Sequence, residues 1–298
     1  MKKPLRAYRP QDMFWGYLMV APTIIGLLIL NIIPFFYSIY LSFCQTGDFG
    51  KTTFSGLANY EKFIADPTVW TSTANTLVYV LLTVPLGVIL ALIFASMLNT
   101  KIRGKDAFRA IYFLPIVCAP AAIAMVWKWM FHGEYGLINQ MLNALGISNI
   151  PWLTDPTWVM VSVSIVTIWS SIGYDIILIL AGLQGISQSY YEAGKIDGAN
   201  GIQQFFRITV PLVSPTMFFV LIMRLMSALK QFDLIYMLVD DKNPALNSAQ
   251  TLTYLFYRQA FVIKDKGYAS VIVLWTFIII AAITCIQFAT QKKWVHYD

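Results

Sequence analysis

Residues 192–215, which read EAGKIDGANGIQQFFRITVPLVSP, decide how this chain folds. The segment is polar and broken by glycines, yet it lies between two long apolar runs, 158–183 and 211–239. Ser189 and Glu192 have the spacing of a capping box, which predicts that a helix starts here. A loop that only connects two membrane spans would not need an ordered helix. We therefore expect an element with a mechanical role.

The rest of the segment predicts a turn followed by a second helix. Gly198 and Gly201 bracket two residues and allow the chain to reverse. Ile202, Phe205 and Phe206 then supply an apolar face that leads into the next span. A helix–turn–helix joined rigidly to a span can carry a rigid-body movement from a soluble partner into a membrane bundle. The alternative is an interfacial amphipathic helix whose glutamate only caps its own first turn.

The composition identifies a membrane protein. Hydrophobic residues make up 58% of the chain and charged residues only 12%, whereas about a quarter of a typical soluble domain is charged. Six apolar runs are long enough to cross a bilayer, which takes roughly 20 helical residues. These runs are 15–43, 71–98, 108–131, 158–183, 211–239 and 268–288. The sequence predicts an all-α integral membrane protein with six spans and a single domain over residues 1–298.

The basic residues predict the orientation of the chain. Twelve of the 21 lysines and arginines fall on one side when six spans are drawn. They are Lys2, Lys3, Arg6, Arg9, Lys101, Arg103, Lys105, Arg109, Lys195, Arg207, Lys292 and Lys293. An excess of basic residues marks the cytoplasmic side, so both termini are expected in the cytoplasm. The net charge of +6 is thereby explained without nucleic-acid binding.

Several kinds of chemistry have no support in the sequence. Cys44, Cys118 and Cys285 lack the spacing of a metal or redox site, and no metal is expected. The chain has no Gly-x-x-x-x-Gly-Lys-Ser/Thr phosphate-binding loop and no nucleophile–base pair, so we expect no enzymatic activity and no bound cofactor. A stand-alone secondary transporter or channel remains an alternative. It would need a relay of buried carboxylates, for which Asp175 is the only strong candidate.

Two ionisable residues lie well inside predicted spans, away from the span ends. A charge near the bilayer centre costs about 2.5–3.5 kcal/mol on insertion scales, so each needs a reason to be there. We expect Asp175 and Arg224 to face the bundle interior, where they either pair with each other or line a substrate path. A structural ion pair that never touches substrate is the competing interpretation.

Three further residues extend this hypothesis toward sugar recognition. Sugar sites combine aromatic faces with hydrogen-bonding side chains, because sugar rings offer apolar faces as well as hydroxyls. Tyr174, Gln231 and Tyr236 supply both features on facing spans. Together with Asp175 and Arg224 they form the predicted substrate path.

The polar segment resembles a known family. Residues 192–194, then Gly198, then residues 208–211 with the sequence ITVP, are similar to the cytoplasmic signature of permease subunits in binding-protein-dependent ABC importers. That signature reads Glu-Ala-Ala, a glycine a few residues later, and Ile-x-Leu-Pro. This chain departs from it at Gly194, where the family has alanine, and at Val210, where it has leucine. Gly194 is expected to loosen the helix somewhat.

The resemblance covers nearly the whole chain and points to the sugar-importing branch. Other matching segments are 21–22, 33–38, 113–115, 136–139, 152–156, 197–199 and Pro215. The resemblance implies a type I (MetI-like) permease bundle with a cytoplasmic coupling helix, in the inner membrane of a prokaryote. It also implies a second, similar permease subunit, two cytoplasmic ATPase subunits that bind ATP and Mg, and an extracytoplasmic sugar-binding protein.

The resemblance further implies which residues meet the ATPase. By carry-over, the coupling loop spans 187–208, Glu192 faces a basic group of the ATPase, and Gly198 makes the turn that seats the helix. The implied coupling residues are Tyr191, Glu192, Ala193, Gly194, Asp197, Gly198, Ala199, Phe205 and Pro211. Alternating access driven by the ATPase would then move a sugar or oligosaccharide through the spans.

Overall fold

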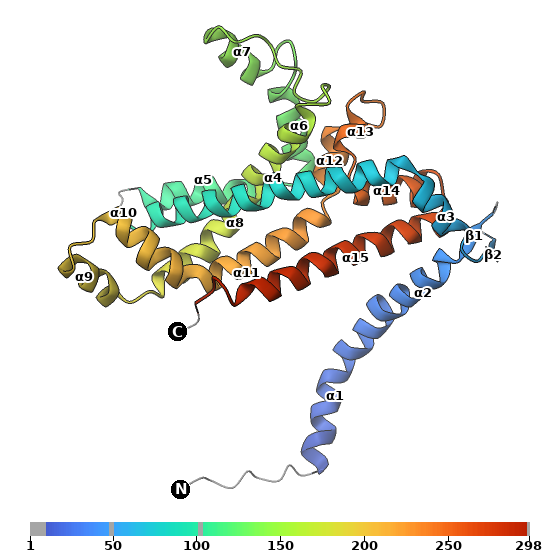
Figure 1. The fold of residues 1–298 in the computed structure, drawn as a ribbon, viewed down its shortest axis with the longest axis horizontal. Coiled ribbons are helices and arrows are strands. Elements are labelled where there is room, and N and C mark those ends of the chain that lie inside the picture. Colours follow the sequence, from blue (N-terminus) through green and yellow to red (C-terminus); the bar gives the residue numbers. More distant parts are fainter. Residues whose placement is uncertain (1–9, 48–50, 101–103, 297–298) are drawn as a thin grey trace. The chain divides into compact units, whose positions relative to one another are not determined.

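The computed structural model describes residues 10–47, 51–100 and 104–296 (Figure 1). Among the residues that carry the predicted orientation, Lys2, Lys3, Arg6, Arg9, Lys101 and Arg103 lie outside these ranges. Contacts divide the chain into two units, one of Met1–Ala65 with Gln259–Leu274, the other of Asp66–Arg258 with Trp275–Asp298. The single membrane domain over 1–298 stays a prediction.

The first unit contains a long N-terminal helical segment and a small hairpin. Its elements are α1 (Pro10–Leu27), the π-helical turn η1 (Leu28–Ile32), α2 (Ile33–Ser42), antiparallel β1 (Cys44–Thr46) and β2 (Thr52–Phe54), and α3 (Ala58–Ala65). Asn59 ties α3 to the hairpin, since its Nδ2 donates to the carbonyls of Ser42 (3.0 Å) and Cys44 (2.8 Å). Lys62 pairs with Asp265 at 2.8 Å. These contacts fix the chain where it leaves the first apolar helix.

The second unit is a helical bundle. Its elements are α4 (Pro67–Leu98), α5 (Lys105–Val117), α6 (Pro120–Met130), α7 (Leu137–Ala144), α8 (Val159–Gln184), α9 (Gln188–Ile196), α10 (Gly201–Gln204), η3 (Phe205–Thr209), α11 (Val210–Leu229), α12 (Asp233–Leu238), α13 (Leu246–Ala249) and α14 (Leu252–Tyr257). The turn η4 (Arg258–Val262) and helix α15 (Lys266–Gln291) follow along the chain, and both are divided between the two units. Helices α4, α8 and α11 pack against one another, with α9 and α10 at one end of the group (Figure 1).

Small residues let α4 approach its neighbours. Gly87, Ala91 and Ala95 recur every four residues on one face of α4, and all three are buried. Such a stripe allows close backbone contact between helices in a membrane, where packing rather than water exclusion drives association. Buried Ile172 and Ile176 of α8 belong to the same apolar cluster as Ala91 and Ala95. This interface adjoins the polar site described below.

Among the residues that the structure describes, five helical segments are long and apolar enough to cross a membrane, and a bent pair makes a sixth if it is one broken span. The five are Met13–Ser42, Pro67–Leu98, Val159–Gln184, Gly201–Leu229 and Lys266–Gln291. The all-α, multi-span fold class predicted from the sequence is thus confirmed.

The third predicted span, 108–131, is not one continuous helix. Ala110–Val117 and Pro120–Met130 meet at a bend of 110°. Cys118 and Ala119 are both extended, with ψ of 140° and 139°. Pro120 explains part of this, because a proline disfavours helical geometry at the residue before it. The continuous apolar run predicted one span here, and the structure divides it at this bend.

The fifth predicted span, 211–239, is longer than the helix that the structure contains. Helix α11 ends at Leu229, and α12 begins at Asp233 after three residues. Phe232, at φ −132° and ψ −54°, lies outside helical geometry. The continuous hydrophobicity of this stretch hid the break. Its consequence is that Gln231 lies in a loop rather than on a helix face.

The segment 132–157 contains a short helix, α7, followed by Gly146 at φ +79°. Asn139 organises the segment and is fully buried. Its Nδ2 donates to the carbonyls of Gly133 (2.8 Å) and Ile150 (2.9 Å). Its Oδ1 accepts from Trp152 Nε1 at 2.9 Å. One side chain therefore holds three separate parts of the loop together.

We expect Asn139→Ala to destabilise this loop by about 1–3 kcal/mol, because the buried groups that Asn139 satisfies would lose their partner. The loop should then be cleaved faster by an added protease, with the bundle left intact. Asn143→Ala is the matched control, since Asn143 is exposed and its side chain donates to the side chain of Asn149, at 2.8 Å. Equal cleavage rates in the two variants would contradict the prediction.

Candidate functional site

The polar segment between α8 and α11 folds as the predicted helix, turn and helix, but with different caps. Ser187, not Ser189, is the N-cap of α9, and its hydroxyl accepts from the amide of Ser189. The capping box predicted at Ser189 and Glu192 is therefore wrong. A capping box does occur at the start of α10, where Asn200 and Gln203 exchange side-chain to main-chain bonds of 2.9 Å.

Gly198 makes the turn that the sequence predicted. Its φ of +77° is in the left-handed region that favours glycine. Its amide donates to the carbonyl of Lys195 (3.1 Å), and the amide of Ala199 donates to the carbonyl of Gly194 (2.8 Å). These two bonds are the Schellman motif, which closes a helix C-terminus. With a capped end on either side, the turn between α9 and α10 is well defined.

Helix α9 is anchored to the residues that lead into α11. The Tyr191 hydroxyl lies 3.1 Å from the Thr209 hydroxyl. Gly194 is buried, and a side chain there would press on Ile208, because an added Cβ would lie 2.8 Å from its Cδ1. This contact gives a reason for the glycine where the family has alanine. Phe205 packs against the α4–α8–α11 core, and Pro211 is in the first turn of α11.

The opposite side of this element is exposed. Glu192, Ala193 and Asp197 are exposed on α9, and Ala199 is half-buried. Large apolar side chains accompany them, with exposed fractions of 87% for Ile196 and 73% for Ile202. Exposed apolar residues rimmed by polar ones are typical of protein–protein contact surfaces.

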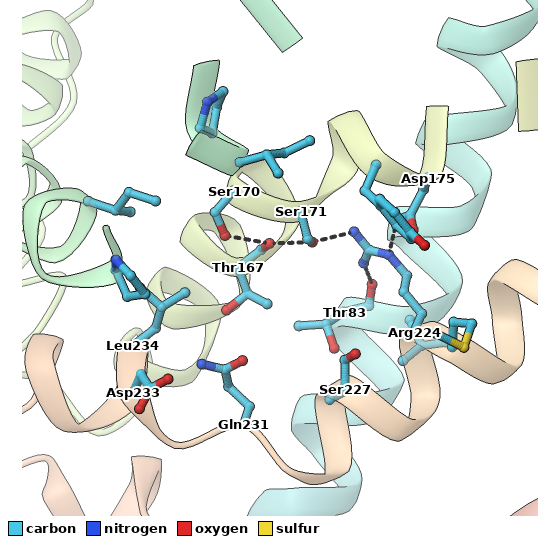
Figure 2. A pocket seen from close by; sticks show the side chains of 18 of the residues that line it. Thr83, Thr167, Ser170, Ser171, Asp175, Arg224, Ser227, Gln231, Asp233 and Leu234 are labelled. Atoms are coloured by element: carbon cyan, nitrogen blue, oxygen red, sulfur yellow. Dashed lines mark hydrogen bonds and ion pairs between the residues drawn. The ribbon is translucent and has the colours of Figure 1, made fainter. Parts of the chain in front are cut away.

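A cavity of about 390 Å³ lies among α4, α8, α11 and the breaks that follow α5 and α11 (Figure 2). Its polar lining residues are Thr83, Thr167, Ser170, Ser171, Tyr174, Asp175, Arg224, Ser227, Gln231 and Asp233. The α5–α6 break contributes Pro115, Cys118 and Pro120 to the wall. Both departures from continuous spans therefore help to form this cavity.

Arg224 is the centre of the polar network (Figure 2). Its Nε donates to Asp175 in a buried ion pair, its Nη1 to the Thr83 carbonyl at 2.7 Å, and its Nη2 to the Ser171 hydroxyl at 2.8 Å. The guanidinium occupies the space beside Gly87, where any side chain would overlap it. Three helices, α4, α8 and α11, are thus joined through one side chain.

The structure brings most of the predicted path residues together. Tyr174, Asp175, Arg224 and Gln231 all line the cavity, and the pairing of Asp175 with Arg224 was one of the two arrangements expected. Whether they contact substrate stays a prediction. Tyr236 is elsewhere: it stacks on Phe232, with ring centroids 5.1 Å apart, and borders a separate cavity.

Sequence reasoning missed the hydroxyl residues of α8. Thr167, Ser170 and Ser171 line the cavity at a spacing of three and four residues, which places them on one helix face. That spacing inside an apolar span was the available signal. Within the described part of the chain, no group of three or more His, Cys, Asp or Glu residues is arranged to hold a metal ion.

Comparison with known proteins identifies the family. Residues 76–295 match the family model described as binding-protein-dependent transport system inner membrane component. The chain is 35% identical over 291 residues to the "Probable ABC transporter permease protein YesP" of Bacillus subtilis, covering 97% of this chain and 94% of that protein. It is 33% identical over 273 residues to the trehalose/maltose transport system permease protein MalF of Thermococcus litoralis, covering 91% of each.

A solved structure shares the fold. A chain of a bacterial alginate ABC transporter, in complex with an alginate pentasaccharide-bound periplasmic protein, superposes with a TM-score of 0.83 at 23% identity. The match covers 95% of this chain and 96% of that one. The sequence resemblance, the helical bundle and these matches agree. The chain therefore belongs to the permease family of binding-protein-dependent ABC importers, in its carbohydrate branch.

Proposed function

We propose that this chain is the membrane subunit of an ATP-driven importer that moves a sugar or oligosaccharide by alternating access. It pairs with a second permease, receives substrate from an extracytoplasmic binding protein, and is driven by two cytoplasmic ATPase subunits that bind ATP and Mg. Both termini face the cytoplasm. The chain itself hydrolyses nothing. ATP binding closes the ATPase dimer, residues 189–206 move with it, and the spans re-open outward.

The observation that carries the proposal is the position of the element α9–α10 in the chain. It directly connects α8 to α11, and these two helices supply Asp175 and Arg224 to the cavity. Its outer side exposes Ile196 and Ile202, while its inner side is held by the contacts of Tyr191 and Gly194. A partner that grips the exposed side would therefore move the cavity walls as a rigid body.

The support for a sugar comes from the cavity and from the relatives. One relative is named for trehalose and maltose. The cavity combines the ring of Tyr174 with the amide of Gln231 and several hydroxyl groups. Sites with an apolar wall and a few convergent polar groups suit sugars.

The proposal is tested by purifying the chain with its operon-encoded or co-expressed partners. A cysteine at Ile196 is expected to cross-link to the ATPase subunit, and the loaded binding protein is expected to raise ATP hydrolysis in proteoliposomes. A cysteine at Ile196 that reacts with no other subunit in any nucleotide state would contradict the proposal. Uptake by this chain alone, driven by an ion gradient, would favour the stand-alone transporter instead.

We expect Gln231→Ala to lower uptake on the order of tenfold while leaving assembly unchanged. A lost hydrogen bond to a bound polar ligand costs about 0.5–1.5 kcal/mol, and the amide also orients the ligand. Uptake and the yield of assembled complex are measured separately. Gln140→Ala is the control, since Gln140 is exposed on α7 and bonds the carbonyl of Tyr135 at 3.1 Å. Normal uptake in Gln231→Ala would remove this residue from the substrate path.

A further inference from the structure

The cavity contains a cation that is not available to a ligand. Arg224 donates to Asp175, to the Thr83 carbonyl and to Ser171, and its side chain is only 7% exposed. The Asp175 carboxylate neutralises its charge within the protein wall. Its guanidinium also fills the space beside Gly87. An anion entering the cavity would find this charge already compensated.

Four hydroxyl groups of the wall are also committed as donors. Each gives its proton to a main-chain carbonyl one turn earlier: Thr83 to Tyr79 (2.7 Å), Thr167 to Val163 (3.0 Å), Ser170 to Thr167 (3.0 Å) and Ser171 to Thr167 (2.7 Å). A hydroxyl has one proton and two lone pairs. These four side chains therefore offer the cavity lone pairs and no hydrogen, and Thr167 and Ser171 each use one lone pair to accept from Tyr79 and Arg224. They form a wall of acceptors.

The remaining charge of the lining is negative. Asp233 is exposed at the start of α12 and borders the cavity, close to Gln231 in the view of Figure 2. Asp175 and Arg224 cancel, so Asp233 leaves the described lining with one net negative charge. A phosphate, sulfonate or carboxylate of a ligand would meet this carboxylate and a row of acceptors. Like charges brought together disfavour such a partner.

We infer that this cavity selects an uncharged, hydroxyl-rich sugar and rejects acidic sugars, with Asp233 as a specificity-determining residue. Sugar hydroxyls donate as well as accept, so they satisfy these acceptors, whereas an ionised carboxylate, sulfonate or phosphate group has no hydrogen to donate to them. Asp175 is a positioning residue, since it acts through Arg224. The inference rests on the proposed function and narrows its substrate class from sugars in general to neutral ones.

The test uses the complete transporter in proteoliposomes, with its binding protein, and a panel of labelled probes: maltose and lactose as neutral disaccharides, digalacturonate as an acidic one, and glucosamine as a cationic sugar. We expect uptake of a neutral probe to exceed that of the acidic one by at least about tenfold. Preferred uptake of digalacturonate or glucosamine would overturn the inference and leave the proposed function standing. Absence of uptake and of sugar-stimulated ATP hydrolysis with every probe would overturn both.

Charge variants separate this chain's contribution from that of the binding protein. Asp233→Lys is expected to make digalacturonate an inhibitor of neutral-sugar uptake at a concentration at least about tenfold lower than in the parent. Asp240→Lys makes the same charge change outside this cavity, beside Lys128, and is expected to leave the inhibition unchanged. Asp233→Asn keeps the size of the side chain and is expected to lower the inhibitory concentration of digalacturonate by an intermediate amount. It provides the test if Asp233→Lys fails to assemble. Equal inhibition in the parent, Asp233→Asn and Asp233→Lys would overturn the inference.

Discussion

Replacing Asp175 with leucine is expected to destabilise the protein by about 3–5 kcal/mol, because Arg224 would remain as a buried cation without its counter-charge. The free energy of unfolding in mixed micelles measures the effect, and the yield of assembled transporter should fall with it. Arg224 would still bond the Thr83 carbonyl and Ser171, but neither of these groups carries a charge. The loss should therefore exceed that of ordinary surface substitutions by several fold.

The control is the double variant Asp175→Leu, Arg224→Met. Replacing both members of a buried ion pair with apolar residues of similar size is often close to neutral. We expect it to recover most of the stability lost by Asp175→Leu alone. A double variant as unstable as the single one would show that the ion pair is not the cause.

Gly198→Val is expected to weaken association with the ATPase by at least about tenfold. A β-branched residue strongly disfavours the left-handed conformation that Gly198 adopts at φ +77°, at a cost of about 1–2 kcal/mol. The Schellman bonds from Gly198 and Ala199 would open, and α9 would leave the orientation that its caps define. ATP hydrolysis by the complex should then no longer respond to loaded binding protein.

Gly201→Ala is the matched control for this variant. Gly201 is the first residue of α10, and an added Cβ there has no neighbour within 4 Å. It lacks the positive φ of Gly198. Its substitution should leave both ATPase association and transport unchanged. Full activity in Gly198→Val, or the same loss in Gly201→Ala, would contradict the assigned role of the turn.

The fold could be predicted where local chemistry decides it. Hydrophobic length located the spans, and glycine at position 198 predicted a reversal that the structure places in the Schellman motif. The breaks after Val117 and Leu229 were missed, because both lie within continuous apolar runs and depend on what packs against them. Proline 120 marks the first break, whereas the second carries no proline or glycine signal.

The charged residues of the site could be predicted from the sequence, but its hydroxyl residues could not. Asp175 and Arg224 stand out as charges in apolar spans, and their pairing follows from the cost of leaving them apart. Thr167, Ser170 and Ser171 did not stand out, because hydroxyl residues that bond their own helix are ordinary in membrane spans. Tyr236 was placed on the path by assuming a helix that continues past Leu229, and the end of α11 removes that assumption.

The nesting of Arg224 between Gly87 and Asp175 has a consequence for how this protein can evolve. Any side chain at position 87 would displace Arg224, and loss of Asp175 would leave Arg224 as an unpaired buried charge. A protein that carries either substitution alone is therefore expected to fold poorly. The three positions, one on each of α4, α8 and α11, therefore form an epistatic unit. Lineages that replace the arginine and the aspartate together are expected to be free to replace the glycine afterwards.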